Sequence, residues 1–597
     1  MVIKRVLLFA FAIILFLALC GAATAASDFN IETAVGGESD SDWSFDGTVL
    51  TIGDGADIII TGAVDNGRCI VVESNAEVNI TLDNVTIDTR NFSTSPFLLN
   101  TGADVALILK GDNFLYAGDN QAGIQTTGAA LKIDGAGSLT ANGGWYSAGI
   151  GGNNGNDGGT VEINGGVVKA ADGWYGSIGI GGGTGSLDDG TLTMNGNGVV
   201  VTPSAASAGA KTSGILFIDD VGTFYGTSVK PTYDFPVPMY STLTIPSGAE
   251  LIIDVDLLMT NQGTVTINSG GKIEVSGEIF NYYGTINNNG GTIEIKVDGN
   301  IGNIGIINNN GGTINNIGGF GNGETGKTEN NGTINNTGTI TNTGAINNIK
   351  TIENSGTIDS YYIGTIDNSG TIDNKAGGTI SSNNLFNNSN TGIINNTGSI
   401  GNYVGTFDNK GTINNDVNGE IGNGWLGTIN NSGTIDNNGK IENVGSATIN
   451  NTGTIDNTRT IDNAGTINNG GTITGTGTIT GSGSINTVKK SQSGGSGFGN
   501  ASIVPLDNRS IQNETPTQVP PSTNNETNIS NNASNQSSDN NSAPASDNNS
   551  APDSESDSSQ ASSSLYVTGS ILLVCVVFVV FAGVAVFVIK RYFNKKA

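Results

Sequence analysis

Residues 447–469 read ATINNTGTIDNTRTIDNAGTINN, and this repeated six-residue pattern decides the fold. An isoleucine returns at every sixth residue, with threonine before it and asparagine or aspartate after it. Short runs of β-forming residues between asparagine and glycine are typical of strands separated by turns, and the spacing that would indicate a helix is missing. The stretch therefore predicts a series of short strands that each carry one isoleucine inward.

The same unit, Gly-Thr-Ile-x-Asn-x, runs from Gly263 to Asn486, with occasional steps of seven or eight residues such as Ile358 to Ile366. We interpret residues 239–488 as a β-solenoid in which each strand holds two or three residues and Asn-x-Gly turns the chain. Glycine, and then asparagine, best accept the left-handed backbone that such corners require. If one coil uses about 20 residues, the repeated stretch would form about 11 coils.

Stacking is expected to stabilise these coils. Neighbouring coils about 4.8 Å apart bring identical side chains into ladders, so inward isoleucines form an apolar column and asparagine amides hydrogen-bond along the corners. Low-complexity disorder is the alternative for a segment so rich in asparagine and glycine. The regular isoleucines favour the solenoid, whose handedness stays open.

A first solenoid is predicted over residues 27–238, where short β-forming runs alternate with glycine, asparagine and aspartate. It contains an internal duplication, because SAGIGG at 147–152 returns as SIGIGG at 177–182, 30 residues later. The strands GTVEINGG at 159–166 and GTLTMNG at 190–196 repeat in the same way. Repeats of this length indicate successive coils along one axis. The predicted fold class is therefore all-β, a parallel β-helix in two parts.

The two ends of the chain predict export and anchoring. Residues 1–25 have the three parts of a secretory signal, namely the basic pair Lys4-Arg5, an apolar run and a small-residue cleavage site. Residues 565–589 carry no charge and exceed the roughly 20 apolar residues that cross a bilayer as a helix. The basic tail 590–597 follows, which favours an extracellular body and a cytoplasmic tail. We expect a single-pass protein of the plasma membrane.

Residues 489–563, between the solenoids and the anchor, consist of Ser, Asn, Pro, Gln and Asp with almost nothing apolar. Such a segment cannot bury a core, so we expect a disordered stalk. N-glycosylation triplets occur there, for example at Asn525, and in the body at Asn79, Asn84 and Asn91. They predict a glycoprotein, although an Asn/Ser/Thr-rich chain also produces such triplets by chance.

Composition excludes several classes of function. The chain of 597 residues has no histidine, which rules out Ser-His-Asp and Cys-His catalysis and histidine-bound zinc. A net charge of −29 repels phosphate backbones, so we expect no nucleic-acid partner. The three cysteines are Cys20, Cys69 and Cys575, one each in the predicted signal, body and anchor. No disulfide is therefore expected within the exported body.

The Gly-rich turns SAGIGG and SIGIGG, with the strands that follow them, make the first solenoid resemble the carbohydrate-binding domain family of right-handed β-helices. These domains occur in bacterial and archaeal surface proteins, and the likeness covers residues 46–225 approximately. The resemblance implies polysaccharide binding, often with bound calcium, in a fold related to polysaccharide lyases. By composition, the Gly-Thr-Ile-Asn-Asn repeats resemble those of adhesin-like surface proteins of methanogenic archaea.

Two aromatic pairs precede the duplicated turns at matching places, Trp145-Tyr146 and Trp174-Tyr175. Stacked coils would set all four rings on one face, where flat aromatic surfaces suit the apolar faces of sugars. The alternative is that the rings cover the edge of the core or pack on each other.

Four acidic residues near these turns offer oxygen ligands to calcium, the one cofactor that we consider. They are Asp157, Asp172, Asp188 and Asp189. Their spacing matches neither an EF-hand nor a nonapeptide calcium repeat, so a solvated role in turns is the simpler interpretation.

No catalytic residue can be assigned, because acidic side chains are scattered one per turn and no carboxylate pair for glycoside hydrolysis stands out. A calcium-dependent polysaccharide lyase would need Arg68, Arg90 or an isolated lysine such as Lys132 or Lys169 as its base, since no arginine lies between Arg90 and Arg459. We expect an adhesin-like surface protein, not an enzyme, that binds extracellular polysaccharide or another surface glycan. A purely structural envelope protein and the lyase are the alternatives.

Overall fold

The computed structural model describes residues 29–33, 42–173 and 175–487, which form strands, turns and connecting segments. The predicted signal, stalk, anchor and cytoplasmic tail lie outside these residues. Across the described ranges, no helix has the length and apolarity that a membrane crossing requires. The described chain is a parallel β-solenoid, so the predicted all-β class is confirmed.

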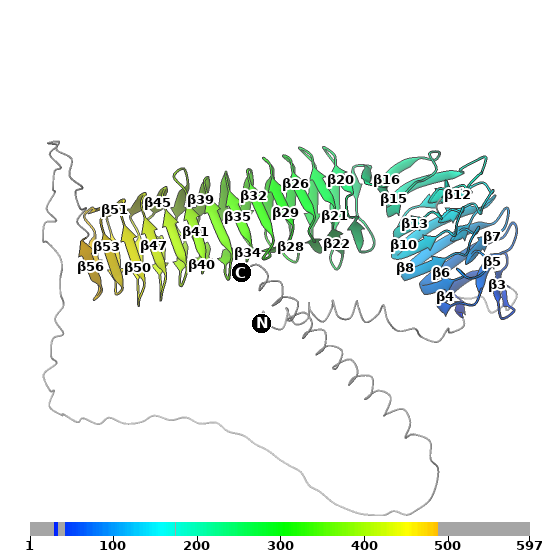
Figure 1. Cartoon of the computed structure of the whole chain (residues 1–597), viewed down its shortest axis with the longest axis horizontal. Helices are drawn as coiled ribbons and strands as arrows, with labels where there is room; N and C mark the ends of the chain where they lie inside the picture. Colours follow the sequence, from blue (N-terminus) through cyan, green and yellow to red (C-terminus); the bar gives the residue numbers. More distant parts are fainter. Residues whose placement is uncertain (1–28, 34–41, 174, 488–597) are drawn as a thin grey trace, which may run out of the picture. The chain divides into compact units, whose positions relative to one another are not determined.

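Long parallel strands build the first solenoid, drawn in blue and cyan in Figure 1. β6 (Glu77–Asp88), β8 (Asp104–Tyr116) and β10 (Ala130–Asn142) lie side by side in one sheet. β10 also pairs along its two halves with β12 (Thr160–Ile163) and β13 (Val167–Ala171). Apolar residues alternate with polar ones along these strands and point into a buried core.

A second sheet of seven short strands closes each coil of the first solenoid. Its strands are β2 (Trp43–Phe45), β3 (Val49–Ile52), β5 (Cys69–Val72), β7 (Phe97–Leu99), β9 (Ile124–Gln125), β11 (Ile150–Gly151) and β14 (Ile180–Gly181). Cys69 is buried and free, and burial raises the pKa of its thiol.

The internal duplication forms neighbouring coils, as the sequence predicts. Ile150 of the first copy pairs in parallel with Ile180 of the second, one coil later. The strand β12 likewise pairs with β15 (Thr191–Thr202), residue by residue along the duplicated segment. The spacing of the duplication is therefore the length of one coil in this part of the chain.

An antiparallel pair connects the two solenoids. β16 (Lys211–Ile218) follows the last long strand and pairs with β17 (Val221–Tyr225) in the opposite direction. β17 then pairs in parallel with β20 (Thr242–Ile245), the first four-residue strand of the repeats. One sheet of 23 strands consequently runs through both solenoids.

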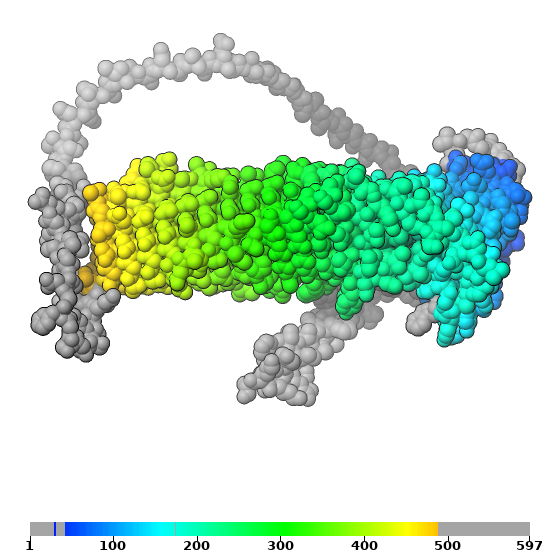
Figure 2. Space-filling view, turned by 90° about the horizontal axis from the view of Figure 1, so that it is seen from above, coloured from blue at the N-terminus to red at the C-terminus, as the bar shows by residue number. Residues whose placement is uncertain are grey.

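The repeat solenoid has three parallel sheets, which we call faces 1, 2 and 3 (green to yellow in Figure 1). Face 1 runs from β20 to β56 (Ser484–Thr487), face 2 from β18 (Ser228–Val229) to β54 (Thr472–Thr474), and face 3 from β19 (Phe235–Val237) to β55 (Thr478–Thr480). The chain passes through face 1, face 2 and face 3 in turn and then returns to face 1. In Figure 2 these coils form a continuous surface.

One short coil shows how the six-residue period arises. It consists of β33 (Thr333–Asn336) on face 2, β34 (Thr339–Asn342) on face 3 and β35 (Ala345–Asn348) on face 1. The next strand, β36 (Thr351–Asn354), lies directly on β33 and pairs Ile334 with Ile352. Three six-residue units, one for each face, therefore complete this coil.

Longer steps insert residues at the corners and lengthen the coil. The buried asparagines Asn336 and Asn354 of neighbouring coils are separated by 18 residues, whereas Asn281 and Asn303 are separated by 22 residues. The twelve strands of face 1 from β23 (Thr264–Ile267) to β56 make eleven coil-to-coil steps. The predicted coil length and the predicted number of coils are therefore both confirmed.

The strands are longer than expected, with four residues in place of two or three. In the pattern Thr-Ile-x-Asn, the isoleucine and the asparagine at the end are buried, while the threonine and the third residue face outward. Successive side chains of a strand point to opposite sides, so the asparagine at the fourth position points inward like the isoleucine. This asparagine is therefore part of the strand and not of the turn that follows it.

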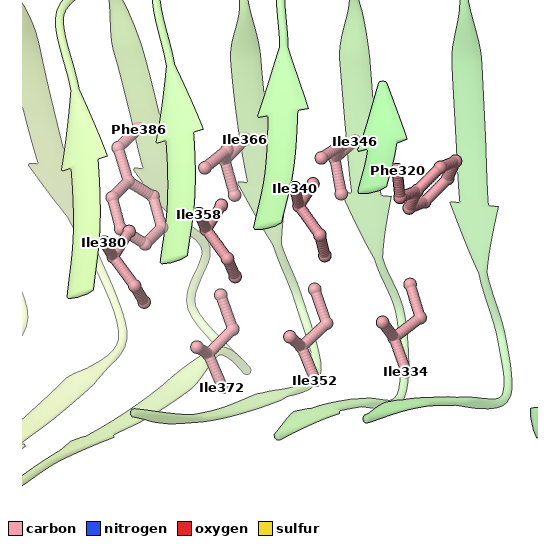
Figure 3. A pocket seen from close by; sticks show the side chains of 10 residues that line it. All are labelled: Phe320, Ile334, Ile340, Ile346, Ile352, Ile358, Ile366, Ile372, Ile380 and Phe386. Atoms are coloured by element: carbon pink, nitrogen blue, oxygen red, sulfur yellow. The ribbon is translucent and has the colours of Figure 1, made fainter. Parts of the chain in front are cut away.

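Isoleucines from the three faces fill the interior and meet one another in Figure 3. Phenylalanine takes the same inward position at Phe320, Phe386 and Phe407, and the rings of the last two stack with centroids 4.5 Å apart. The free space among ten of these side chains is about 10 Å³, no more than a single water needs. This interior is a core and has no room for a ligand.

Three ladders of buried asparagine run along the corners, one at the end of each face. Asn316 donates from Nδ2 to Oδ1 of Asn336 at 2.7 Å, and Asn336 donates to Asn354 at the same distance. The amide of Asn336 also donates to the backbone carbonyl of Thr357 at 3.0 Å. These contacts confirm the predicted amide ladders, and every one of these three hydrogen bonds joins two different coils.

Asn336→Ala should lower the free energy of unfolding by about 2 kcal/mol or more, because it leaves a buried donor of Asn316 and a buried acceptor of Asn354 unpaired. Asn335, one residue earlier, points outward and donates to Oδ1 of Asn315 at 2.8 Å, so it is the matched control for an amide contact that water can reach. Asn335→Ala should lower stability by no more than about 1 kcal/mol, because water can replace the lost partner. Urea denaturation of both variants checks this, and equal losses would show that the buried ladder adds no stability.

Candidate functional site

One corner of the first solenoid brings together three of the four predicted aromatic residues. It is formed by the turns that leave β8, β10 and β13 and enter β9, β11 and β14. The amide of Asn120 donates to the carbonyl of Trp145, and the amide of Tyr146 donates to that of Gly173. The three turns are thus stacked coil on coil, and we call Trp145, Tyr146 and Tyr175 the aromatic corner.

Glycine makes this close stacking possible. A Cβ atom on Gly144 would lie 1.8 Å from the carbonyl oxygen of Gly118, and one on Gly173 would lie 1.5 Å from that of Gly144. Any larger residue would therefore separate the turns, so the glycine before each aromatic pair sets the distance between the rings.

The rings pack on each other and remain open to solvent. Tyr146 and Tyr175 stack with centroids 5.1 Å apart and planes at 24°, while Trp145 meets Tyr175 at 6.1 Å and 62°. Trp145 is 56% exposed and Tyr175 is 63% exposed. These rings therefore lie on one face, as expected, and they also pack on each other, as in the alternative interpretation. Trp174 lies outside the described residues.

The backbone holds these tyrosines in a conformation that tyrosine rarely adopts. Tyr146 has a φ of 67° and Tyr175 a φ of 61°, in the left-handed region. Asn120 has a φ of 67° at the corresponding place one coil earlier, where the left-handed conformation is easily accepted. A bulky residue in this region costs about 1–3 kcal/mol and is often found at functional sites.

Polar groups lie beside the rings. Thr184 donates from its amide to the carbonyl of Tyr146 and from its hydroxyl to the carbonyl of Tyr175 at 3.0 Å. Asn154 donates its side-chain amide to that of Asn120 at 2.7 Å, and both side chains are exposed. Exposed aromatic faces next to amide donors and acceptors can bind a ligand with apolar faces and hydroxyl groups, such as a sugar.

The four predicted calcium ligands lie in the segments that connect strands. Within residues 29–33, 42–173 and 175–487, no three Asp, Glu, Cys or His side chains are grouped as a metal ion requires. Oδ1 of Asp157 instead accepts the amides of Leu187 and Asp188 at 2.7 and 2.9 Å. Oδ1 of Asp188 accepts the amide of Gly190. These acids therefore fit the alternative role, in turns.

Asp172 and Asp189 do not change this conclusion. Burial, together with the charge of Asp219, raises the pKa of the Asp172 carboxyl, which is unfavourable for a ligand that must be ionised. Asp189 is exposed at the end of its turn.

Three of the four candidate lyase bases contact a neighbouring group. Arg90 forms an ion pair with Asp88 and lies 4.9 Å from the centre of the Tyr116 ring, and its hydrogen bond lowers the pKa of the Asp88 carboxyl. Arg68 donates to the carbonyl of Gly47, and Lys132 lies 3.9 Å from Glu162. Lys169 is exposed on β13.

Comparison with known proteins gives no family for this chain. No family model matches it, and no curated protein matches it. Among solved structures, a TibC-catalyzed hyper-glycosylated TibA55-350 fragment is similar over 70% of this chain and 100% of the fragment, at 14% sequence identity and a TM-score of 0.17. At that score the likeness carries no argument about this chain.

Asp157→Ala should free the amides of Leu187 and Asp188 and speed their hydrogen exchange, because their acceptor is removed. Asp189→Ala, in the same turn, is the control and should leave the exchange of both amides unchanged. Calcium should also have no effect on exchange in the unaltered protein. Slower exchange of residues 183–190 on adding calcium would show that the acids bind the ion.

Proposed function

We propose that this protein is an adhesin-like surface protein that binds polysaccharide or another surface glycan through the aromatic corner. The observation that carries the proposal is the stack of exposed rings on strained backbone. A ring that only filled space would gain nothing from a left-handed conformation that costs about 1–3 kcal/mol. A ring that must present its face to a ligand gains a fixed orientation from it.

The ligand class follows from the chemistry of the corner. Aromatic faces bind the C–H faces of sugar rings, and the neighbouring amides of Asn120 and Asn154 can exchange hydrogen bonds with hydroxyl groups. The nearby Asp157 and Asp188 are occupied by backbone amides, so calcium is not part of the proposal.

The cellular setting of the proposal rests on the sequence. The secretory signal, the stalk and the apolar segment 565–589 would place both solenoids outside the cell on a single-pass anchor. In the sequence, the repeat solenoid lies between the aromatic corner and the predicted anchor, and it offers further surface for adhesion. The exposed triplet asparagines Asn79, Asn84 and Asn91 are open to modification in this setting.

Glycan-array binding of the full-length protein in mild detergent tests the proposal. The variant with Trp145→Ala and Tyr175→Ala should lose binding by about tenfold or more, since each aromatic contact contributes about 0.5–1.5 kcal/mol. Val221→Ala combined with Val255→Ala removes exposed apolar side chains elsewhere and should leave binding unchanged.

The two alternatives give different results in the same assay. A folded protein that binds no glycan would be a purely structural envelope protein. Release of unsaturated sugars from an acidic polysaccharide in the presence of calcium would identify a lyase.

A further inference from the structure

Every tyrosine and tryptophan of the repeat solenoid lies at one of its three corners. This is the corner where face 3 passes to face 1, and the other two corners contain neither residue between residues 239 and 487. The residues are Tyr240, Tyr282, Tyr283, Tyr361, Tyr362, Tyr403 and Trp425. We call this set the aromatic edge. The phenylalanines of the same region are inward, except for Phe280 on face 3.

Strand pairing places these residues in line. The strands of faces 3 and 1 pair in unbroken order, so successive corners between them lie directly on one another. Tyr240 and Tyr283 are two coils apart, and so are Tyr362 and Tyr403. Two coils correspond to about 10 Å along the stack, which is the length scale of a disaccharide. Trp425 follows Tyr403 on the next coil.

Four of these aromatic residues have a left-handed backbone, as do the two tyrosines of the aromatic corner. The φ angles are 69° at Tyr240, 58° at Tyr283, 57° at Tyr362 and 49° at Trp425. Glycine holds this conformation at another corner of the same solenoid, for example at Gly248. Glycine would adopt it without strain, so the aromatic side chain must have a use that offsets the strain.

The aromatic edge is open to solvent. Tyr240, Tyr362 and Trp425 are 81%, 78% and 75% exposed. The ring of Tyr403 is nevertheless supported from below, because a Cβ atom on Gly401 would lie 2.9 Å from it. This glycine leaves the surface of face 3 flat where the ring lies on it.

The edge is also almost uncharged. Among its corner segments only Glu324 carries a charge, although the chain as a whole has a net charge of −29. Neutral polar residues stand between the aromatic positions, at Gln262, Thr343 and Asn383. The same corners also expose apolar side chains next to the rings, at Met239, Ile363, Val404 and Leu426. The charged side chains lie on other surfaces, such as Lys272 among three glutamates on face 2. A partner suited to the edge is therefore neutral, with hydroxyl groups and apolar faces.

We propose that the aromatic edge binds an extended chain of an uncharged polysaccharide that lies along the stack of coils. The rings stand one, two or four coils apart, which is about 5, 10 or 19 Å along the stack. Spacings in whole coils, with hydrogen-bonding residues between the rings, suit a ligand that repeats along its length. The inference extends the proposed function to a second site and shares with it only the class of ligand.

Full-length protein in mild detergent, mixed with insoluble cellulose or chitin, tests this inference. The variant with Tyr240→Gly, Tyr283→Gly, Tyr362→Gly and Trp425→Gly should bind at least about tenfold more weakly. Its denaturation midpoint should stay the same or rise, because glycine relieves the left-handed strain. Binding by the unaltered protein should be unchanged in about 0.5 M salt, a concentration that screens charges beyond about 4 Å.

A matched control removes exposed apolar side chains from the corner between faces 2 and 3, with Val255→Ser, Val297→Ser and Val417→Ser. This variant should bind cellulose or chitin as the unaltered protein does. The variant altered at Trp145 and Tyr175 separates the two sites. If only that variant loses binding, the proposed function stands and the aromatic edge is no binding site.

Three further results would overturn the inference. The first is that the unaltered protein binds neither polysaccharide. The second is a lower denaturation midpoint of the glycine variant, which would give the rings a role in stability. The third is sedimentation showing that the unaltered protein associates while the glycine variant does not, with equal polysaccharide binding, which would make the edge a contact between copies.

Discussion

Hydrogen bonding between one coil and the next is the constraint on which the rest of this structure depends. Each strand of the repeat solenoid finds its backbone partners only in the coils before and after it, and the buried amides follow the same rule from Asn316 to Asn336 to Asn354. Within the described body Cys69 is free, so no disulfide reinforces the coils there. A coil alone could not pair its buried amides or cover its isoleucines, so the stability of each coil depends on the coils packed on both sides of it.

The same constraint explains why insertions and exposed aromatic residues occur at the corners of the coils. A coil keeps its register through a four-residue strand on each face, most often Thr-Ile-x-Asn, but the residues between faces have no partner ladder that fixes their number. Insertions there make the coil that joins Asn281 to Asn303 longer than the one that joins Asn336 to Asn354, and no sheet is broken. Both sets of exposed aromatic rings use this freedom, for example at Tyr175 in the first solenoid. Loops on a rigid scaffold commonly carry function for this reason.

The architecture could be predicted from the sequence because each six-residue unit supplies one strand to one of the three faces. Which asparagine of Thr-Ile-Asn-Asn is buried could not be predicted, because the sequence does not distinguish the two side chains. Only the alternation of side chains along the strand turns the second asparagine inward. Sequence reasoning finds the aromatic corner through the duplication that contains Trp145 and Tyr175. It misses the aromatic edge, whose signal is the longer step between isoleucines, as between Ile358 and Ile366. The role of Asp157 depends on hydrogen bonds to two amides that are distant in sequence, which spacing does not reveal.

The shortest coil, made of three six-residue units, has a consequence for how such a gene can change. Where successive units are nearly interchangeable, as in residues 447–469, unequal recombination or slippage can add or delete a whole coil in frame. The isoleucine columns would close again across the junction, because the neighbours on both sides present isoleucine in the same register. Each event would alter the length of the stack by about 4.8 Å. Lineages could therefore tune the reach of this protein in small, inheritable increments while conserving its cross-section.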